Sequence, residues 1–536
     1  MRAHSASVIP LRPLLLSMAI SAVPFLAQAD TKGAAEALLN SKCQTCHLPT
    51  DKGLNRIDES RRTPEGWDMT IVRMMVSHGV ELTPEERQTL VKYLADTRGL
   101  APEESAAHRY LLERDFTLIE QPKDQLVADT CARCHSYGRI GLQRRTEEDW
   151  RKLVHYHVGQ YPVIEIQQGG RDRDWWEIAS GEVPKRLDKL YGLDSEAWRK
   201  WLQHESVSAA GQWRVVGHRP GWGAYEGQAT ISSNGDDHYS IKLTLNYANG
   251  KQETAEGKAV LYTGYEWRAT VKQGDMNVRQ VFTLSPDGQT LSGRWYQAGI
   301  DAIGGRFEAV RDGKEAPARL LAVEPSYIKA GTTQQVTLYG SNLSGDVSLG
   351  EGVEVLKVVE RSTGKLVVEA RAAAGAKDGV RAVKVGDSQL DKGLALYQKL
   401  DYISIEPDQA MARIGGNGGA MPKIPVQFES VGYANGPDGK PGTADDIRLG
   451  YFPAKWTLDN LNAYAAQLKD AEYSGRLQED GLFIPGDAGP NPKRKFGTNN
   501  AGELKVTAVV DDAGHKVEAS KPLVVTVQRW NDPSIR

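Results

Sequence analysis

The pattern of hydrophobic and polar positions divides the chain into a helical first part and a strand-rich remainder. Up to about position 205, apolar residues recur at the spacing of amphipathic helices. Two of these helices have clear start signals: Thr83 with Pro84 and Glu86, and Asp194 or Ser195 further on. Beyond that position apolar and polar residues alternate, which is typical of half-buried strands. The predicted fold class is therefore multidomain, with a helical amino-terminal domain followed by three antiparallel β-domains.

Turn signals divide the strand-rich part into three domains. Residues from Tyr239 to Leu245 alternate and end at Asn249-Gly250, a strong hairpin signal within a β-barrel domain predicted over 209–316. In 317–399, Val-Glu-Pro at 323–325 and Val-Thr-Leu-Tyr-Gly-Ser-Asn-Leu at 336–343 resemble bacterial Ig-like domains of the IPT/TIG type. That resemblance implies a β-sandwich and no particular function. The segment 400–536 is again strand-rich, and we predict a carboxy-terminal β-sandwich domain there.

Residues 1–29 have the pattern of a cleavable secretory signal. Arg2 and Arg12 precede a short apolar run from Leu14 to Leu26, and Ala27-Gln28-Ala29 offers a small-x-small cleavage site. A retained membrane anchor is the alternative, but the apolar run is short. We therefore expect a mature protein that begins at Asp30 and is exported to the periplasm, with no membrane-spanning segment.

Composition and charge narrow the classes of partner. The chain has 536 residues, of which 40% are hydrophobic and 25% are charged, and its formal net charge is −3. This length suggests about three to four domains. A nearly neutral chain without a basic block lacks the electrostatic footprint of a nucleic-acid-binding protein. We expect no nucleic-acid partner.

All four cysteines lie in two copies of Cys-x-x-Cys-His, at 43–47 and 131–135. Two thiols three positions apart can form thioethers to the two vinyl groups of one haem, and the following histidine can bind the iron. A zinc site, a redox dithiol or a disulfide could also use paired cysteines, but none of them requires a histidine directly after both pairs. We therefore predict two covalent c-type haems. The attachment residues are Cys43 and Cys46 for the first and Cys131 and Cys134 for the second, with His47 and His135 as iron ligands.

The sequence around the two motifs repeats, which divides the helical part into two modules. Arg-Thr at 62–63 and Trp67 after the first motif correspond to Arg-Thr at 145–146 and Trp150 after the second. Each copy resembles a small class-I-like cytochrome c module, in which the haem supplies much of the core. We predict a di-haem domain at 30–208, with modules at about 30–105 and 106–208.

The repeat also bears on the second axial ligand of each iron. Aligning the two tryptophans puts Met74 opposite His157, and there is no methionine between Cys134 and Met276. The second haem therefore needs a histidine, and His157 is predicted, with His155 as the alternative. Because these two histidines are two positions apart, a helix would turn them in different directions.

In the first module, Met74 is the predicted second ligand, with Met75 and His78 as alternatives. A thioether ligand raises the potential of a haem relative to a second imidazole. A pair of haems with these ligands would pass electrons from the His135 haem to the His47 haem. Two six-coordinate haems offer no open position for substrate, so the pattern favours electron transfer.

Two CxxCH motifs, the repeated Arg-Thr-x-x-x-Trp pattern and the order of domains together resemble the alpha subunit of quinohaemoprotein amine dehydrogenase. The resemblance implies a periplasmic heterotrimer that oxidises primary amines to aldehydes and ammonia. It places a cysteine tryptophylquinone on a small gamma subunit and adds a β-propeller beta subunit. The two haems would then pass electrons to a soluble blue-copper protein or cytochrome c. Because the haem motifs use every cysteine here, the quinone must lie on another chain, and we expect no catalytic residue in this one.

Two other functions remain open from the sequence. A di-haem peroxidase-like enzyme would need one haem with an accessible sixth position, and it leaves the β-domains without a role. A stand-alone periplasmic electron carrier, or an adhesion-type scaffold bearing haems, is suggested by the Ig-like segment. The β-domains contain no evident catalytic motif. An acid-rich loop at 435–446 would form either a calcium site or an ordinary polar turn.

Overall fold

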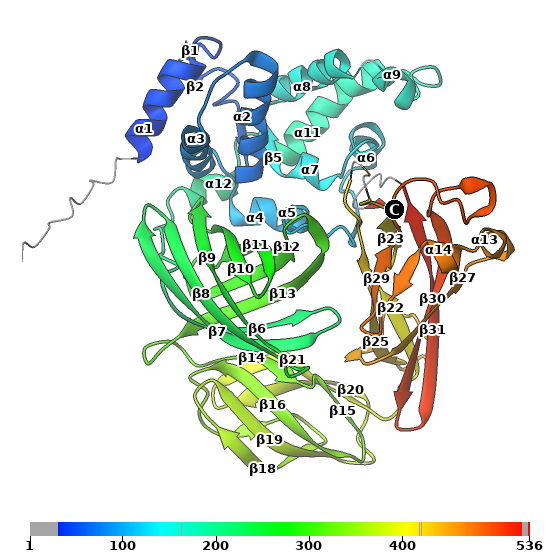
Figure 1. Cartoon of the computed structure of the whole chain (residues 1–536). Helices are drawn as coiled ribbons and strands as arrows, with labels where there is room; N and C mark the ends of the chain where they lie inside the picture. Colours follow the sequence, from blue (N-terminus) through cyan, green and yellow to red (C-terminus); the bar gives the residue numbers. More distant parts are fainter. Residues whose placement is uncertain (1–30, 162, 418, 420, 528–533, 536) are drawn as a thin grey trace, which may run out of the picture.

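The computed structural model describes residues 31–161, 163–417, 419, 421–527 and 534–535. A helical region lies across one end of a β-barrel, and a two-sheet sandwich lies at the other end of the barrel (Figure 1). The carboxy-terminal β-domain runs alongside the barrel and reaches the helical region (Figure 1). The predicted order, helices first and β-structure after, is confirmed. The predicted signal segment lies outside the described residues.

The helical region consists of two modules and a short connection. The first module contains α1 (Thr31–Leu38), η1 (Leu39–Cys43), α2 (Pro64–His78) and α3 (Pro84–Thr97), with the two-residue strands β1 (Pro49–Thr50) and β2 (Gly53–Leu54). The connection contains α4 (Pro102–Ser105), η2 (Ala106–His108), α5 (Arg109–Leu112) and β4 (Ile119–Glu120). The second module contains α6 (Gln125–Cys131), α7 (Gly138–Gly141), α8 (Glu147–Gln160), α9 (Ile164–Gln167), α10 (Trp175–Glu177), η3 (Ile178–Glu182), α11 (Val183–Tyr191) and α12 (Glu196–Trp201). No helix among the described residues is long and apolar enough to cross a membrane.

Side-chain caps define where the main helices begin. Thr83 and Glu86 form a reciprocal capping box at the start of α3, as their spacing predicts, and Ser195 caps α12. The threonine of each repeated Arg-Thr pair is also a cap: Thr63 accepts from the amide of residue 66 at 3.3 Å, and Thr146 from the amide of residue 149 at 3.1 Å. Such a cap is worth about 1 kcal/mol. The repeat therefore marks the start of equivalent helices, α2 and α8.

The residues just before these two caps form strands that pair with each other. β3 (Ser60–Arg62) and β5 (Gln143–Arg145) are antiparallel, with Arg61 opposite Arg144. Two equivalent segments that pair antiparallel are related by a local two-fold axis, as in an isologous dimer. The two modules are thus joined through the repeated motif itself.

The first β-domain is a closed barrel of eight strands. Each strand neighbours the next in sequence, and β13 closes the barrel against β6. The strands are β6 (Gly211–Arg219), β7 (Gly223–Gly235), β8 (His238–Tyr247), β9 (Gln252–Tyr262), β10 (Glu266–Gln273), β11 (Met276–Leu284), β12 (Thr290–Gln297) and β13 (Ile300–Asp312). Trp213, Trp267 and Trp295 are buried in its core. Closure leaves no strand edge free to pair with another chain.

The second β-domain is a sandwich of two four-stranded sheets around one core. One sheet contains β14 (Arg319–Glu324), β16 (Thr333–Ser341), β19 (Lys365–Ala372) and β18 (Val353–Arg361). The other contains β15 (Tyr327–Lys329), β21 (Ser388–Tyr397), β20 (Gly379–Val385) and β17 (Val347–Ser348). This architecture is the one that the IPT/TIG-like segment implies.

The carboxy-terminal domain packs three smaller sheets around a third core. Its elements are β22 (Tyr402–Glu406), β23 (Ala410–Arg413), β24 (Val426–Gln427), β25 (Glu429–Ala434), β26 (Ile447–Phe452), β27 (Lys455–Asn460), α13 (Ala463–Leu468), α14 (Asp470–Tyr473), β28 (Gly475–Leu477), β29 (Leu482–Pro485), η4 (Lys495–Gly497), β30 (Gly502–Asp512) and β31 (His515–Thr526). A last short strand, β32 (Ser534–Ile535), pairs in parallel with β4 of the helical region. The end of the chain therefore returns to the helical modules.

Candidate haem sites and the arginines between them

The first Cys-x-x-Cys-His motif begins at the end of η1. Cys43 is the last residue of this turn, and the amide of His47 donates to the Cys43 carbonyl at 2.9 Å. The His47 Nδ1 donates to the carbonyl of Asn55 at 3.0 Å, which leaves Nε2 with the lone pair that a metal requires. Cys43 also contacts the hydrophobic cluster of the first module. This arrangement fits a haem held by two thioethers and one imidazole.

The second motif has the same design. Cys131 is the last residue of α6 and contacts the hydrophobic cluster of the second module. The His135 Nδ1 lies 3.1 Å from the carbonyl of Ser136, which again leaves Nε2 for a metal. The described chain contains no disulfide at Cys43, Cys46, Cys131 or Cys134. These residues also fit a haem, which would supply one-electron redox chemistry at its iron.

The two histidines of α8 differ in their surroundings. The His157 Nδ1 donates to the Leu153 carbonyl at 2.8 Å. Burial lowers the pKa of His135, and the charges of Arg139 and then of His157 add to this effect, which indicates that His157 lies near His135. The His155 ring instead packs edge-on against Trp176, with 4.9 Å between the ring centroids. These surroundings favour His157 over His155, which stays the alternative, as the predicted second ligand of this site.

The second ligand of the first site is less sharply defined by the structure. Met74 and Met75 are both half-buried on α2, and Met75 packs against the hydrophobic cluster that also contacts Cys43. His78, at the end of the same helix, is exposed. The repeat places Met74 opposite His157, whereas the packing of the first module favours Met75. Met74 stays the predicted ligand, and Met75 is its main alternative.

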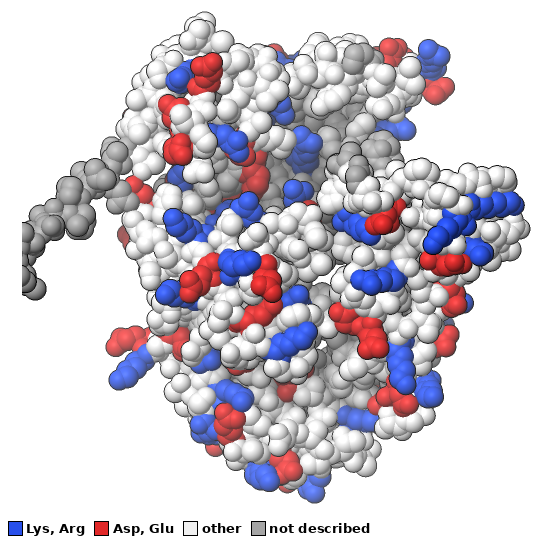
Figure 2. Space-filling view, in the orientation of Figure 1, with Lys and Arg blue, Asp and Glu red and all other residues white. Residues whose placement is uncertain are grey.

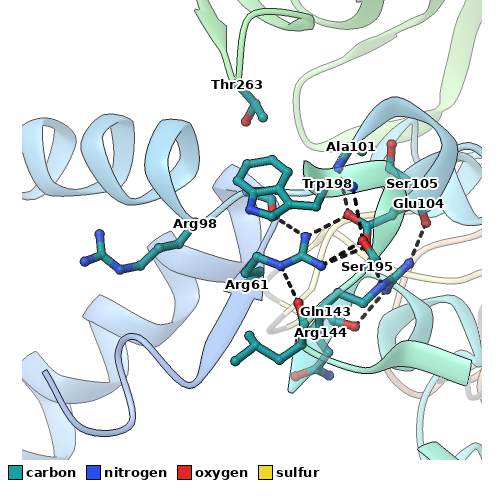
Figure 3. Close-up of polar contacts among 12 residues, drawn as sticks. Arg61, Arg98, Ala101, Glu104, Ser105, Gln143, Arg144, Ser195, Trp198 and Thr263 are labelled. Carbon is teal, nitrogen blue, oxygen red and sulfur yellow. Dashed lines mark hydrogen bonds and ion pairs between the residues drawn. The ribbon is translucent and has the colours of Figure 1, made fainter. Parts of the chain in front are cut away.

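A buried glutamate joins the two modules where β3 and β5 pair. Glu104, on the connecting helix α4, accepts from Arg61 Nη1 at 2.7 Å and Nη2 at 2.9 Å, and from Arg144 Nε at 3.1 Å (Figure 3). The Ser195 hydroxyl donates to the same carboxylate at 2.8 Å. The side chains of Glu104 and the two arginines are 5 to 7% exposed. Burial alone would raise the pKa of Glu104, but its bonds and its two cationic partners lower the pKa to about 2.

Sequence reasoning did not single out this carboxylate or its two partners. Arg61 and Arg144 stand directly before the repeated Arg-Thr pair, so the longer repeat Arg-Arg-Thr was the available signal. Their guanidinium groups also stack, Arg61 over Trp198 at 4.9 Å and Arg144 over Tyr191 at 5.1 Å. The network fixes the orientation of one helical module relative to the other.

His108, in the segment that connects the two modules, is a second buried polar residue. The His108 Nε2 is 3.3 Å from the Tyr191 hydroxyl, and its ring is surrounded by Tyr110, Tyr137 and Tyr191. Burial, and then the charges of Lys123 and Arg144, lower the pKa of His108 to about 4. His108 is therefore a neutral packing residue near pH 7, and its contacts are with tyrosines and not with either motif.

In the acid-rich loop at 435–446, the carboxylates of Asp445 and Asp446 accept hydrogen bonds from groups of the loop itself and from Tyr402. Asp446 accepts from the Tyr402 hydroxyl at 2.6 Å and from the amides of residues 436, 442 and 443 at 2.7 to 3.0 Å. The Thr443 hydroxyl donates to Asp445 at 2.8 Å. Within the part of the chain that the structure describes, no group of three or more His, Cys, Asp or Glu side chains is arranged for a metal ion.

Charged side chains of both signs are interspersed over the β-domains on the face seen in Figure 2. The same view shows a hollow over the helical region with basic side chains on its walls.

Comparison with known families finds models that cover almost the whole chain. "Quinohemoprotein amine dehydrogenase A, alpha subunit, haem binding" matches residues 33–198. Domains II, III and IV of the alpha subunit of the same enzyme match residues 206–312, 317–398 and 403–535. No curated protein matches the chain.

Solved structures give only weak likenesses. A redesigned β-barrel bound to DFHBI is 17% identical, with coverage of 19% of this chain and 91% of that chain and a TM-score of 0.17. A structure of mouse clustered PcdhgC3 EC1-3 is 14% identical, with coverage of 45% and 76% and a TM-score of 0.17. Likenesses of this strength carry no argument about function.

Proposed function

Because the chain belongs to the family of quinohaemoprotein amine dehydrogenase alpha subunits, we propose that it is the di-haem electron-transfer subunit of a periplasmic amine dehydrogenase. A primary amine is oxidised to an aldehyde and ammonia at a cysteine tryptophylquinone on a small gamma subunit. Electrons pass through the two haems of this chain to a soluble blue-copper protein or cytochrome c. A β-propeller beta subunit completes the heterotrimer.

The observation that carries the proposal is the pair of Cys-x-x-Cys-His motifs, each with its histidine Nδ1 at a backbone carbonyl. That bond fixes the tautomer and turns Nε2 toward a metal. The closeness of His157 to His135 supports a second haem with two imidazole ligands. A haem with both axial positions filled has no room for substrate, which favours electron transfer over a peroxidase-like reaction.

The residues of this chain act by holding the haems in place. Cys43 and Cys46, and Cys131 and Cys134, anchor the two haems covalently, while His47 and His135 bind their iron atoms. We assign Met74 to the remaining position of the first iron and His157 to that of the second. A thioether ligand would favour the ferrous state of the first haem relative to a second imidazole, so these residues would give the first haem the higher potential.

In this proposal, the contacts between the two modules hold the haems at a fixed distance and orientation relative to each other. Glu104 bridges Arg61 and Arg144, which come from equivalent positions of the two modules. The β-domains contain no residue that needs to react, so in this proposal they position the other subunits. We place the complex in the periplasm because residues 1–29 have the pattern of a cleavable signal.

Anaerobic visible spectroscopy of the complex purified from its own periplasm tests the proposal. Addition of a primary amine should reduce the haems and make the α-band grow, while a tertiary amine, which cannot give ammonia and an aldehyde, is the control. If the haems stay oxidised with primary amine but are reduced by a chemical donor, the chain is a cytochrome that receives electrons from another redox partner. Turnover of peroxide with a high-spin ferric signal would instead support the peroxidase-like alternative.

A further inference from the structure

The ribbon formed by β3 and β5 has two faces that differ in charge balance. Side chains of a strand alternate between faces, and directly opposed residues share one face. Arg61 and Arg144 are opposed and both meet the carboxylate of Glu104. The next arginine of each motif, Arg62 and Arg145, therefore points to the other face. On that face, no carboxylate of the described residues hydrogen-bonds to both arginines.

On this second face the two arginines share a neutral partner. The Gln143 Oε1 accepts from Arg145 Nε at 2.9 Å and from Arg62 Nη1 at 3.3 Å. Arg145 also pairs with Asp149, whose side chain is 1% exposed. The Nε of Arg62 is buried and has no hydrogen-bond partner. Asp149 therefore pairs with Arg145 but not with Arg62, and the Nε of Arg62 and the Oδ1 of Asp149 are both left without a hydrogen-bond partner.

Three more arginines border the same space. Arg56 Nε lies 4.0 Å from Asp149 Oδ1. The guanidinium of Arg73, on α2, lies 5.5 Å from the centre of the Tyr156 ring, and Arg139 donates to the sulfur of Met69 at 3.3 Å. Within the described chain, Arg73 and Arg139 form no ion pair with a carboxylate. Arg56, Arg62, Arg73, Arg139 and Arg145 are called the arginine cluster below, and Asp149 pairs with two of them, Arg145 and Arg56.

The members of the cluster are close enough to act on one another. Burial, followed by the charge of Arg145, lowers the pKa of Arg62 well below its ordinary value, and Arg73 and Arg56 add to this effect. Burial is also the main cause that lowers the pKa of Arg139, with a contribution from Arg73. Like charges held together out of water are costly unless an anion pairs with them. The cluster is therefore suited to a bound anion with several oxygen atoms.

Its position connects the cluster to both haem motifs. Arg56 follows Asn55, whose carbonyl holds His47, and Arg73 precedes Met74. Arg139 lies four residues after His135, and the guanidinium of Arg73 lies over the ring of Tyr156, which directly precedes His157. The anion that binds here must therefore lie beside the iron ligands of the two modules.

We propose that the arginine cluster binds propionate carboxylates of the two haems, so that both haems direct negative charge into one shared site between the modules. This inference rests on the proposed function, because it requires haem at both motifs. Guanidinium groups suit the ligand, since their paired N–H groups match the two oxygens of a carboxylate. The doubled Arg-Arg of the repeat then has two separate tasks: the first arginine of each copy joins the modules, and the second binds the haems.

The test uses the holoprotein with Arg73→Gln or Arg139→Gln, because neither side chain has a carboxylate partner whose loss would disturb the fold. Arg151→Gln is the matched control: Arg151 lies on the same helix as His157 but pairs with Glu147 and Glu148. Haem content, the resonance Raman bands of propionate bending and the midpoint potential of each haem are measured for all variants. Arg73→Lys keeps the charge of position 73 without the two-pronged contact.

Loss of a cationic partner should favour the ferric state of the adjacent haem. We expect Arg73→Gln and Arg139→Gln each to lower the equilibrium constant for haem reduction about tenfold, which is about 59 mV for one electron. The propionate bands should shift in both variants, shift partly in Arg73→Lys, and stay unchanged in Arg151→Gln. If potentials and bands of both glutamine variants match those of the control, the propionate assignment is wrong.

A free anion such as inorganic phosphate could satisfy the same chemistry. Titration of the wild-type protein with phosphate at constant ionic strength separates the two sources. A propionate-filled site predicts haem potentials that do not change with phosphate, whereas a phosphate-dependent shift would overturn the proposal. Reduction of the haems by amine is followed in parallel, so a failure of this inference with intact amine oxidation is distinct from a failure of the proposed function.

Discussion

Replacement of Glu104 by glutamine should weaken the attachment of the two helical modules to each other. The substitution keeps the size of the side chain and one carbonyl oxygen but removes the negative charge. It would leave Arg61 and Arg144, whose side chains are 5% and 7% exposed, without their shared counter-ion. The hydroxyl of Ser195 would also lose its charged acceptor. The perturbation is therefore confined to the junction between β3, β5 and α4.

The expected loss of stability follows from two independent routes. Lowering the pKa of a carboxyl from 4.5 to about 2, as the surroundings of Glu104 do, corresponds to about 3.4 kcal/mol of stabilisation. Removing one partner of a buried ion pair costs about 3–5 kcal/mol, because a charge is left buried and unpaired. We therefore expect Glu104→Gln to lower the free energy of unfolding of the haem domain by about 3–5 kcal/mol at pH 7.

The pH dependence gives a second signature of the same carboxylate. Because the folded-state pKa lies below the unfolded value, the stabilisation is fully present above about pH 4.5 and is lost as the pH falls toward about 2. Urea unfolding of the full-length holoprotein, followed by the Soret absorption, measures the effect at pH 7 and again under acid conditions. Wild type and Glu104→Gln should differ most at pH 7 and converge at low pH.

Glu103→Gln provides the matched control on the same helix. Glu103 is exposed, and its substitution should change the unfolding free energy by less than about 0.5 kcal/mol. A loss below about 1 kcal/mol for Glu104→Gln, or a loss equal to that of the control, would refute the assignment of Glu104 as the link between the modules.

Three further predictions concern the iron ligands and the buried histidine. His157→Ala should turn the second haem high-spin, while His155→Ala should keep the low-spin spectrum; equal spectra of the two variants would contradict the assignment of His157. Met74→Leu should abolish the iron–sulfur charge-transfer band and lower the potential of the first haem, and if Met75→Leu does so instead, Met75 is the ligand. Because burial lowers the pKa of His108 to about 4, stability should fall between about pH 6.5 and 4 as the unfolded state takes up a proton first, by at most about 3.4 kcal/mol. His108→Gln should flatten this part of the curve of unfolding free energy against pH, and an unchanged slope would show that another group titrates.

The sequence predicted those features that short stretches of chain determine. The prediction of the haem attachment residues rests on five consecutive positions, and the cap at Thr83, which the structure confirms, follows from three. The hairpin at Asn249-Gly250 lies between β8 and β9, where Gly250 has a φ of +81° that suits glycine. Each of these signals is local, so no knowledge of distant contacts was needed.

The features that were missed depend on contacts between distant segments. β3 and β5 are three residues long, too short for a period of two to be visible, and 83 positions separate Arg61 from Arg144. Glu104 stands in an ordinary helical turn, and nothing nearby in sequence marks it as buried. The choice between Met74 and Met75 is open for a similar reason, since adjacent positions on α2 differ only in how the folded module packs.

The single carboxylate between two equivalent arginines explains why a duplicated motif can act in two ways. Two copies of Arg-Arg-Thr that pair antiparallel bring four arginines together. Without acidic partners, their positive charges would repel one another. Glu104 holds Arg61 through two N–H groups and Arg144 through one, so both arginines on one face of the ribbon share a single carboxylate. On the other face Asp149 pairs with Arg145 but not with Arg62, and Arg56 and Arg73 add further positive charge. The module junction therefore becomes rigid on the face that carries the acid and able to bind an anion on the face that lacks it. A second acid there would strengthen the junction but would remove the positive charge that a haem carboxylate needs.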